Sequence, residues 1–169
     1  MNDISQDIAI HTISIYVANK PGVLARISQV FSRRGFNIDS LVVSPSVDGR
    51  YSRMTVAAQG SISGLEQIIL QVSKLVDVLH CIDHSNSNAI VREMALVKME
   101  INSEQRAEAL QICEHYGCKT VDLTTNAMTA MVSGQSGKID ACINMLQKFK
   151  IIELVRTGKV VMARGDEAT

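Results

Sequence analysis

Two asparagines, Asn19 and Asn37, flank a short helical pattern that opens with Pro21 and Gly22. Proline suits the first position of a helix because the N–H that it lacks would have no acceptor there. Glycine lets the backbone approach a ligand closely. Free N–H groups at a helix N-terminus bind carboxylates, and a carboxamide both donates and accepts hydrogen bonds. These residues predict a site for a small amino acid, and since none is a nucleophile or a poised base, we expect regulation rather than catalysis.

A plainer interpretation of the same residues stays open. Asparagine is common where strands end in turns, and Gly22 can serve the helix start alone. Val23, Leu24 and Ile27 recur at helical spacing, which is typical of a core-facing stripe. Of these three, only Val23 and Leu24 are candidates for the wall of a pocket.

A second group of chemically capable residues, His80, Cys81, Asp83 and His84, resembles a set of metal ligands. On a strand, the two histidines would share a face, but their Cα atoms would lie ~13 Å apart at the usual rise per residue. That separation is too large for one zinc ion without a bend in the strand. We therefore predict no metal site here.

The remaining cysteines do not form a metal-binding motif. Cys113, His115 and Cys118 flank a helix end without a fourth ligand, so we interpret them as core thiols and a surface imidazole. With Cys81 and Cys142 they make four cysteines at irregular spacing and no C-x-x-C pair. We expect reduced, buried thiols.

The segment 133–138, SGQSGK, suggests a phosphate-binding loop but lacks the spacing of a P-loop. A helix beginning at Ser136 and Gly137 can still hold an anion or a nucleotide at its N-terminus. The sequence leaves this alternative open.

Composition excludes several classes of function. The 169 residues are 46% hydrophobic and 20% charged, enough for a core and unlike a disordered chain. Seventeen basic residues balance 17 acidic ones, and there is no tryptophan. A neutral chain with few aromatic residues lacks the charge and the stacking surface of a nucleic-acid binder. Zero net charge with this hydrophobic content instead favours an oligomer.

No apolar run reaches the ~18–20 residues that a membrane helix needs. Residues 1–12, MNDISQDIAIHT, carry two aspartates and lack the basic and apolar regions of a secretory leader. We therefore expect a cytoplasmic protein without a membrane partner.

The elements that position these residues follow from periodicity. In the first half we predict strands at 9–18, 37–47, 51–58 and 75–83, a helix at 22–34 ended by Gly35, a hairpin turn at Asp48-Gly49, and a second helix capped by Ser63. The order is β-α-β-β-α-β, the split pattern of ferredoxin-like folds.

The same order of strands and helices is repeated after the polar linker at residues 84–91. We predict a strand at 94–101, a helix from Ser103 to Gly117, paired strands around Asn126, a helix from Ser136, and closing strands within 151–165. The sequence therefore predicts an α+β protein of two tandem ferredoxin-like βαββαβ modules, residues 1–85 and 86–169.

Several blocks in the first half resemble an ACT domain, and more specifically the small regulatory subunit of acetolactate synthase, also called acetohydroxyacid synthase. They are NKPGVLARISQVFSRRGFNIDSLVV, SRMTVAAQG, LEQI and KLVDVL. In the second half, VREMALVKM, SGKIDACI and IIELVRTGKVVMARG are similar to the C-terminal domain of that family. The blocks occur in the family's order through nearly the whole chain.

The resemblance implies a homodimer through the ACT domains, with the feedback inhibitor valine at the interface. Carried onto this chain, the loop of one subunit contributes Asn19, Gly22, Val23 and Leu24, and the other subunit contributes Asn37 and Ile38. Main-chain amides would hold the carboxylate, the carboxamides would accept from the ammonium, and apolar side chains would enclose the isopropyl group. Leucine and isoleucine are alternative effectors.

The resemblance also implies that this chain is not itself an enzyme. In that family a separate large subunit carries out catalysis, with thiamine diphosphate, Mg and FAD, and the small subunit activates it and confers valine inhibition. No cofactor is expected on this chain. The competing hypothesis is a free-standing ACT-type sensor or co-regulator that acts on another partner.

Overall fold

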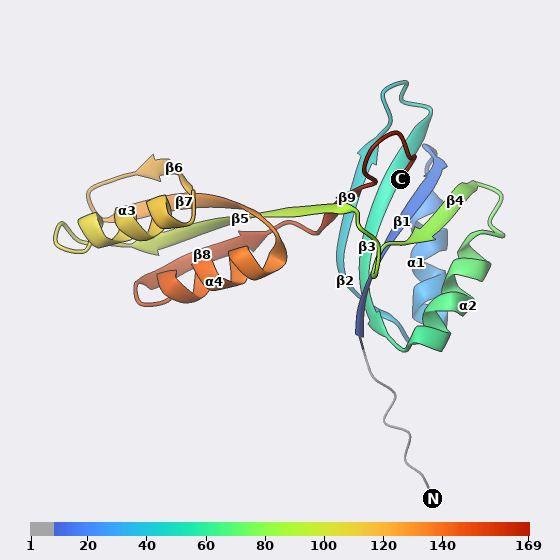
Figure 1. Ribbon diagram of the computed structural model, residues 1–169, viewed down its shortest axis with the longest axis horizontal. Coiled ribbons are helices and arrows are strands. Elements are labelled where there is room, and N and C mark those ends of the chain that lie inside the picture. Colours follow the sequence, from blue (N-terminus) through green and yellow to red (C-terminus); the bar gives the residue numbers. More distant parts are fainter. Residues whose placement is uncertain (1–8) are drawn as a thin grey trace, which may run out of the picture. The chain divides into compact units, whose positions relative to one another are not determined.

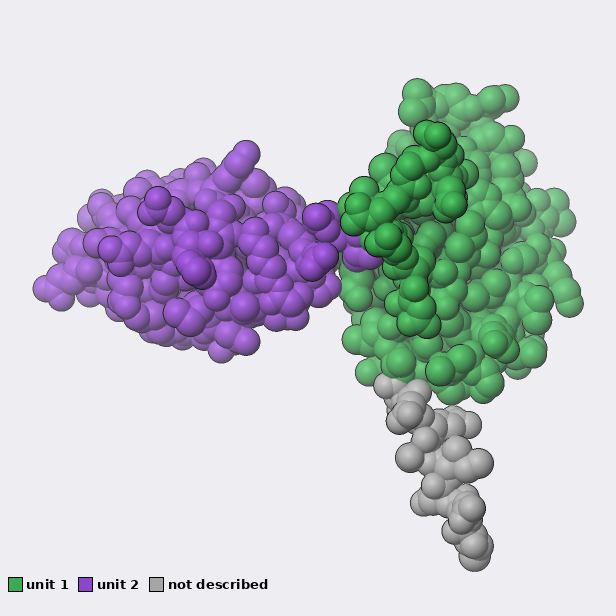
Figure 2. All heavy atoms as spheres, viewed as in Figure 1, with its two compact units in different colours: residues 1–90, 158–169 green, residues 91–157 purple. Residues whose placement is uncertain are grey.

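The computed structural model describes residues 9–169, which form two compact units (Figure 2). Unit 1 contains the chain up to Ile90 and residues 158–169, and unit 2 contains residues 91–157. The expected boundary after residue 85 thus lies a few residues later. The last twelve residues belong to unit 1 rather than to the second module, because they pack on its sheet. Most of the segment searched for a secretory leader, residues 1–8, lies outside the described residues.

Unit 1 has the predicted βαββαβ order (Figure 1). Its elements are β1 (Ala9–Ala18), α1 (Val23–Arg33), β2 (Asn37–Pro45), β3 (Tyr51–Gly60), α2 (Ile62–Val72) and β4 (Val78–Asp83). The strands form an antiparallel sheet in the order β2-β3-β1-β4, which leaves β2 at an edge, as Pro45 near its end suggested.

The two helices of unit 1 cover one face of this sheet and enclose its core (Figure 1). Alternate residues of β1, Ile13, Ile15 and Val17, are fully buried against α1 and α2. From α1, Ile27 and Phe31 reach the same core at helical spacing. The apolar residues that recur at helical spacing in α1 and at alternate positions in β1 therefore pack into one layer, as the sequence predicts.

Helix α2 begins two residues earlier than predicted. Ser61 is its N-cap residue, and the Ser61 hydroxyl accepts a hydrogen bond from the N–H of Gly64 (3.3 Å). Ser63, which we expected to cap the helix, lies within the first turn. Both serines precede the apolar stripe, so the pattern alone did not decide between them.

The last segment of the chain covers the other face of the unit 1 sheet (Figure 1). Gly158 lies so close to Ser40 and Val42 of β2 that a Cβ on it would sit 2.8 Å from the Ser40 hydroxyl. At the far end, the backbone oxygen of Thr169 is 2.8 Å from Nε2 of His80 on β4. The segment 158–169 thus crosses the sheet from β2 to β4, and Ser14 on the central strand β1 is fully buried.

Unit 2 repeats the topology. Its elements are β5 (Ile90–Glu100), α3 (Arg106–His115), β6 (Lys119–Leu123), β7 (Ala127–Gly134), α4 (Ser136–Leu146) and β8 (Lys150–Arg156). The strand order of this sheet is β6-β7-β5-β8. The short strand β9 (Val160–Met162) lies in the segment 158–169, which belongs to unit 1. The predicted inward residues of α4, Ile139, Cys142, Ile143 and Leu146, are all buried.

Three other elements start three or four residues away from their predicted positions. Strand β5 starts four residues early, at Ile90, and β4 starts at Val78 because residues before it form a turn. Helix α3 begins at Arg106 rather than Ser103, since residues 103–105 form a separate turn. The α+β fold of two ferredoxin-like modules is nevertheless confirmed. Within residues 9–169, no helix is both long enough and apolar enough to cross a membrane.

Candidate functional site

The loop that follows β1 is held in place by the hairpin turn between β2 and β3. The backbone N–H of Asn19 donates to the carbonyl of Arg50 (2.9 Å), and Nδ2 of Asn19 donates to the carbonyl of Gly49 (3.0 Å). Just before it, the N–H of Ala18 donates to the carbonyl of Asp77 (2.8 Å). Asn19 therefore forms a turn contact, as the plainer interpretation proposed, but one that joins residues far apart in sequence.

Gly22 is the N-cap residue of α1 and has a left-handed backbone, with φ of 84°. An L side chain is strained in this region, so glycine is needed for conformation. A Cβ built at Gly22 would meet no atom within 4 Å, so the space beside it is open. No side chain caps the helix and no acidic residue lies in its first turn. The N–H of Val23 donates to the carbonyl of Lys20 (3.5 Å), and no side chain occupies the next N–H groups of α1, which are thus available to an anion.

Val23 and Leu24 lie in the first turn of α1 but face in different directions. Val23 is buried in the unit 1 core, whereas Leu24 is 42% exposed. Leu24 is therefore the apolar side chain of this pair that is free to contact a ligand, while Val23 supports the loop from below.

A second set of contacts fixes the loop from the side of β4. The carboxylate of Asp77 accepts a hydrogen bond from Arg26 of α1 at 2.7 Å, and the ammonium of Lys20 lies 4.0 Å away. The side chain of Asp77 is largely buried while both cations are exposed. Asp77 thus joins the loop and α1 to the segment before β4.

Asn37 and Ile38 lie at the opposite end of the same sheet. Asn37 starts the edge strand β2 and pairs with Gln59, which in turn pairs with Ile10 near the start of β1. Asn19 follows Ala18, which is eight residues further along β1, a distance of about 27 Å along the strand. One copy of the chain therefore does not bring Asn19 and Asn37 together.

The carboxamide of Asn37 is oriented by its own strand. Its Nδ2 donates to a carboxylate oxygen of Asp39 (3.0 Å), at a bulge between Ile38 and Ser40. Asn37 is exposed, and Ile38 is half-buried against the core. In both Asn19 and Asn37 the amide nitrogen is thus used within the chain, which leaves the amide oxygen to accept from a ligand.

The turn that supports Asn19 is itself stabilised by Asp48. A hydrogen bond from the Ser46 hydroxyl, followed by those from Arg50, lowers the pKa of Asp48 to about 2. Gly49 takes a left-handed conformation there, with φ of 70°. The sequence predicted this turn from Asp48-Gly49 but gave no signal that it contacts Asn19. It also gave no signal for Asp77, because both contacts join distant parts of the chain.

The other candidate residues have structural partners. Nε2 of His84 lies 2.8 Å from the Ser14 hydroxyl, and His80 contacts the backbone of Thr169. Among residues 9–169, no group of three or more His, Cys, Asp or Glu side chains is arranged to hold a metal ion. In the segment 133–138, the ammonium of Lys138 donates to the carbonyl of Ser133 (3.2 Å).

A ferredoxin-like module with a glycine-led, uncapped helix start and an open edge strand defines unit 1 as an ACT-type module. Family models agree: residues 13–80 match the ACT domain of acetohydroxyacid synthase small-subunit-like proteins, and residues 92–165 match the small subunit of acetolactate synthase.

Individual relatives extend this similarity over nearly the whole chain. The acetolactate synthase small subunit of Mycolicibacterium smegmatis is 37% identical over 155 residues, covering 92% of this chain and 91% of its own. A probable acetolactate synthase small subunit of Methanothermobacter thermautotrophicus is 42% identical over 156 residues, covering 92% and 93%. The crystal structure of the small subunit from Thermotoga maritima matches with a TM-score of 0.83 and 35% identity, covering 94% and 99%. The chain therefore belongs to the family of acetolactate synthase small subunits.

Proposed function

We propose that this chain regulates an acetolactate synthase by binding a branched-chain amino acid, with valine as the first candidate, between the ACT modules of two copies. The observation that supports this most directly is the start of α1, where Gly22 leaves open space and no side chain caps the N–H groups that follow Val23. Membership of the family supplies the enzyme and the pathway class.

The separation of the two asparagines supports a two-fold dimer. Strand β2 is an edge strand, so its outer N–H and C=O groups are open to a second copy. Antiparallel pairing of two β2 strands would reverse one module relative to the other. The Asn37 end of one copy would then approach the loop end of its partner. Such an interface would use the same patch on both subunits, as a two-fold dimer requires.

The chemistry of the assembled site fits a branched aliphatic amino acid. The α1 N–H groups would hold the carboxylate, worth about 0.3–1 kcal/mol from the helix dipole. The amide oxygens of Asn19 and of Asn37 from the partner would accept hydrogen bonds from the ammonium. Leu24 and Ile38 would enclose the isopropyl group, whose full burial is worth roughly 1.5–3 kcal/mol.

The partner in this proposal is the large, catalytic subunit, which would carry thiamine diphosphate, Mg and FAD. The small subunit would raise the activity of that partner, and valine would lower it by favouring one arrangement of the complex. The shift equals the difference in valine affinity between the two arrangements, typically about 1–3 kcal/mol.

Reconstitution tests this function. Adding the full chain to an acetolactate synthase large subunit should raise the rate of acetolactate formation, and valine should reduce the rate of the complex but not of the large subunit alone. A rate that is unchanged by the chain and by valine would refute the proposal. Binding of valine without stimulation would favour the alternative of a free-standing sensor.

Mixed dimers test the site. Calorimetry should show that Asn19→Ala and Asn37→Ala each abolish valine binding, while the control Asn126→Ala in unit 2 leaves it intact. A dimer of one Asn19→Ala chain and one Asn37→Ala chain should recover one site of two, because one interface pairs the two intact asparagines. No recovery in the mixed dimer would mean that each site is built within a single chain.

A further inference from the structure

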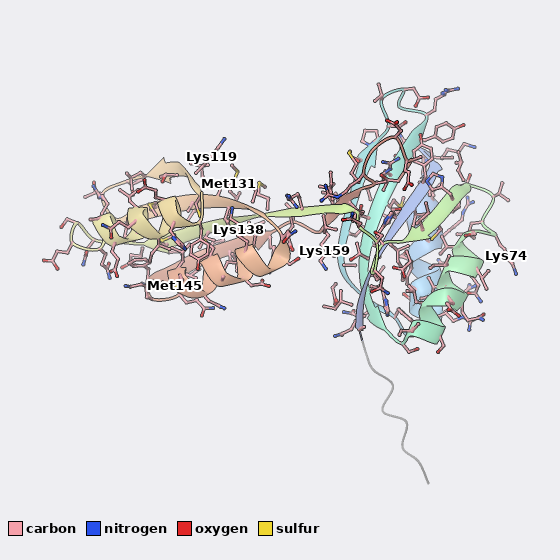
Figure 3. The ribbon with its side chains drawn as sticks, viewed as in Figure 1. Lys74, Lys119, Met131, Lys138, Met145 and Lys159 are labelled. Carbon is pink, nitrogen blue, oxygen red and sulfur yellow. The ribbon has the colours of Figure 1, made fainter. Side chains whose placement is uncertain are left out.

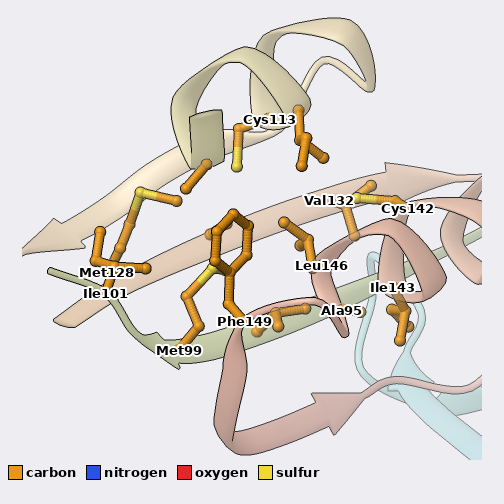
Figure 4. Packing of buried hydrophobic residues seen from close by; sticks show 14 of the residues in the cluster. Ala95, Met99, Ile101, Cys113, Met128, Val132, Cys142, Ile143, Leu146 and Phe149 are labelled. Atoms are coloured by element: carbon orange, nitrogen blue, oxygen red, sulfur yellow. The ribbon is translucent and has the colours of Figure 1, made fainter. Parts of the chain in front are cut away.

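Three of the four cysteines gather in the core of unit 2. Cys113 on α3 and Cys142 on α4 are both buried in the apolar cluster between helices and sheet (Figure 4). Cys118 packs against the same cluster from the segment before β6. The sulfur atoms of Cys118 and Cys142 are 3.4 Å apart. Nothing in the effector site or in the packing of an apolar core requires two thiols in contact.

The local backbone places Cys118 at the edge of this cluster. Gly117 ends α3 with φ of 63°, and the N–H of Cys118 then donates to the carbonyl of Cys113 (2.7 Å). Cys118 is half-buried, whereas Cys142 is fully buried and Cys113 nearly so. Of the three thiols, Cys118 is therefore the one that a small reagent from solvent can reach.

A cation lies beside this accessible thiol. Lys138 extends from the first turn of α4 (Figure 3), and its ammonium lies 3.8 Å from the position that a Cβ on Gly117 would take. Hydrogen bonding from the thiols of Cys113 and Cys142 lowers the pKa of Cys118, and the charge of Lys138 lowers it further. The pKa of Cys142 is raised, chiefly because its thiol donates to Cys118. These opposite shifts favour the thiolate at Cys118, the more exposed of the two, and the thiol at Cys142.

We propose that Cys118 and Cys142 are a hydroperoxide-reactive pair that closes to a disulfide within unit 2. The Cys118 thiolate attacks the terminal oxygen of a hydroperoxide ROOH; the O–O bond breaks, and an S–O bond forms. With the uptake of a proton, the products are the sulfenic acid of Cys118 and ROH. The Cys142 sulfur then displaces water from that sulfenic acid. Two thiols and one ROOH thereby become one disulfide, ROH and water, with two electrons passing to the hydroperoxide.

The disulfide would join two elements that lie on either side of the unit 2 core. Cys118 immediately precedes β6, and Cys142 lies in the middle of α4. The bond would fix the end of α3 to α4 and restrict local opening of this unit. This inference does not depend on the proposed function, because it involves neither the ACT module nor the large subunit.

Peptide mapping of the oxidised full chain tests the proposal. The chain is treated with hydrogen peroxide, blocked with N-ethylmaleimide and digested with trypsin. We expect peptide 107–119, which contains Cys113 and Cys118, to be linked to peptide 139–148, which contains Cys142. The intact chain should lose two hydrogen atoms. An unlinked digest would overturn the proposal, as would a disulfide confined within peptide 107–119.

Single substitutions identify the bonded pair. Cys113→Ser should retain the link between the two peptides, and so should Cys81→Ser, the matched control in unit 1. Cys118→Ser should abolish it. In Cys142→Ala, which replaces the thiol by an apolar methyl group, dimedone should trap the sulfenic acid of Cys118. Loss of the link in Cys113→Ser, or an absence of dimedone adduct in Cys142→Ala, would contradict the assigned roles.

The accessible thiolate can be tested without an oxidant. Alkylation of Cys118 by iodoacetamide should already be fast below the ordinary thiol pKa of about 8.5, and Lys138→Gln should move the pH midpoint of its rate upward. Cys81, whose pKa is raised to about 12 by burial, should react slowly throughout the range. A Cys118 rate that rises only near the ordinary thiol pKa would refute the proposed division of roles.

Discussion

The two modules share one topology, yet their first helices begin in different ways. In unit 1, α1 starts at Gly22 without a side-chain cap. In unit 2, the turn before α3 is closed by its own side chains: the N–H of Gln105 donates to Oδ1 of Asn102 (2.8 Å), and the N–H of Asn102 donates to Oε1 of Gln105 (3.2 Å). Neither helix has a side-chain cap, but α3 carries an acidic residue, Glu108, in its first turn, whereas α1 begins after a left-handed glycine and carries none. This contrast supports placing the effector site in unit 1.

The faces of the two sheets that are not covered by helices also differ. In unit 1 this face is buried beneath residues 158–169 and contains hydrogen-bonded polar side chains, among them Ser14 and His84. In unit 2 the corresponding face carries Leu96 and Val155, which are neighbours on β5 and β8, and Val155 is 51% exposed. The two modules thus differ in this face: in unit 1 it is covered and polar, and in unit 2 it is open and combines apolar side chains with the Lys98–Glu153 ion pair.

The largest effect should come from breaking an ion pair at the edge of the unit 2 core. Nε of Arg156 donates to Glu93 at 2.6 Å, and the Glu93 carboxylate is only 5% exposed. Arg156→Met removes the guanidinium from this buried carboxylate and from Asp140, so we expect unit 2 to lose about 2–4 kcal/mol of unfolding free energy. Native-state hydrogen exchange measures the stability of each unit separately. Protection should fall in β5 and β8 of unit 2 and stay unchanged in β1 and β3 of unit 1.

An exposed pair on the same strands provides the control. Lys98 and Glu153 are joined at 3.3 Å, but both side chains are close to half exposed. Lys98→Met should change stability by less than about 1 kcal/mol. Equal losses in the two variants, or a loss of protection that spreads into unit 1, would contradict the assumption that each unit has its own core.

Alanine substitutions at two glycines distinguish the effect of backbone strain from an effect on ligand binding. Gly22 and Gly117 both have positive φ, 84° and 63°. An alanine at either position should cost about 1–2 kcal/mol of stability in its own unit, because an L side chain is strained there. Gly22→Ala should also weaken valine binding at least about tenfold, the equivalent of about 1.4 kcal/mol, by displacing the first α1 N–H groups. In calorimetry, Gly117→Ala should bind valine as the unaltered chain does.

The architecture was predictable from sequence because it depends on local periodicity. Alternating residues such as Ile13 and Ile15, and the helical spacing of Ile27 and Phe31, placed the core of unit 1 correctly. The N-cap of α2 was assigned to Ser63 instead of Ser61, since both serines, two positions apart, satisfy the local pattern. Errors of this kind move a boundary by a turn and leave the fold intact.

The candidate site was only partly predictable, because its supports are not local. Asn19 is positioned by the hairpin turn at Gly49 and Arg50, thirty residues away in sequence. The segment 158–169 was assigned to the second module because nothing in its sequence indicates that it returns to the first. Contacts of this type depend on which faces the completed fold leaves uncovered, and a linear pattern does not contain that information.

The smallest effect, a pH dependence, should also be confined to unit 1. His84 is buried beside Ser14, and burial lowers its pKa; Arg53 lowers it further, while Asp83 acts in the opposite direction. A group that binds protons less readily when folded makes unfolding easier in acid. The stability of unit 1 should therefore decrease as the pH falls below the ordinary histidine pKa of about 6.5, and be regained above it. Hydrogen-exchange protection factors in β1 and β4, corrected for intrinsic exchange, measure this change.

Unit 2 supplies the internal control for this pH dependence, because its single histidine, His115, is exposed. Its protection should vary little over the same pH range. His84→Gln retains a group that can hydrogen-bond Ser14 but does not titrate, so it should flatten the response of unit 1. If the response persisted in His84→Gln, another group on the covered face would be responsible.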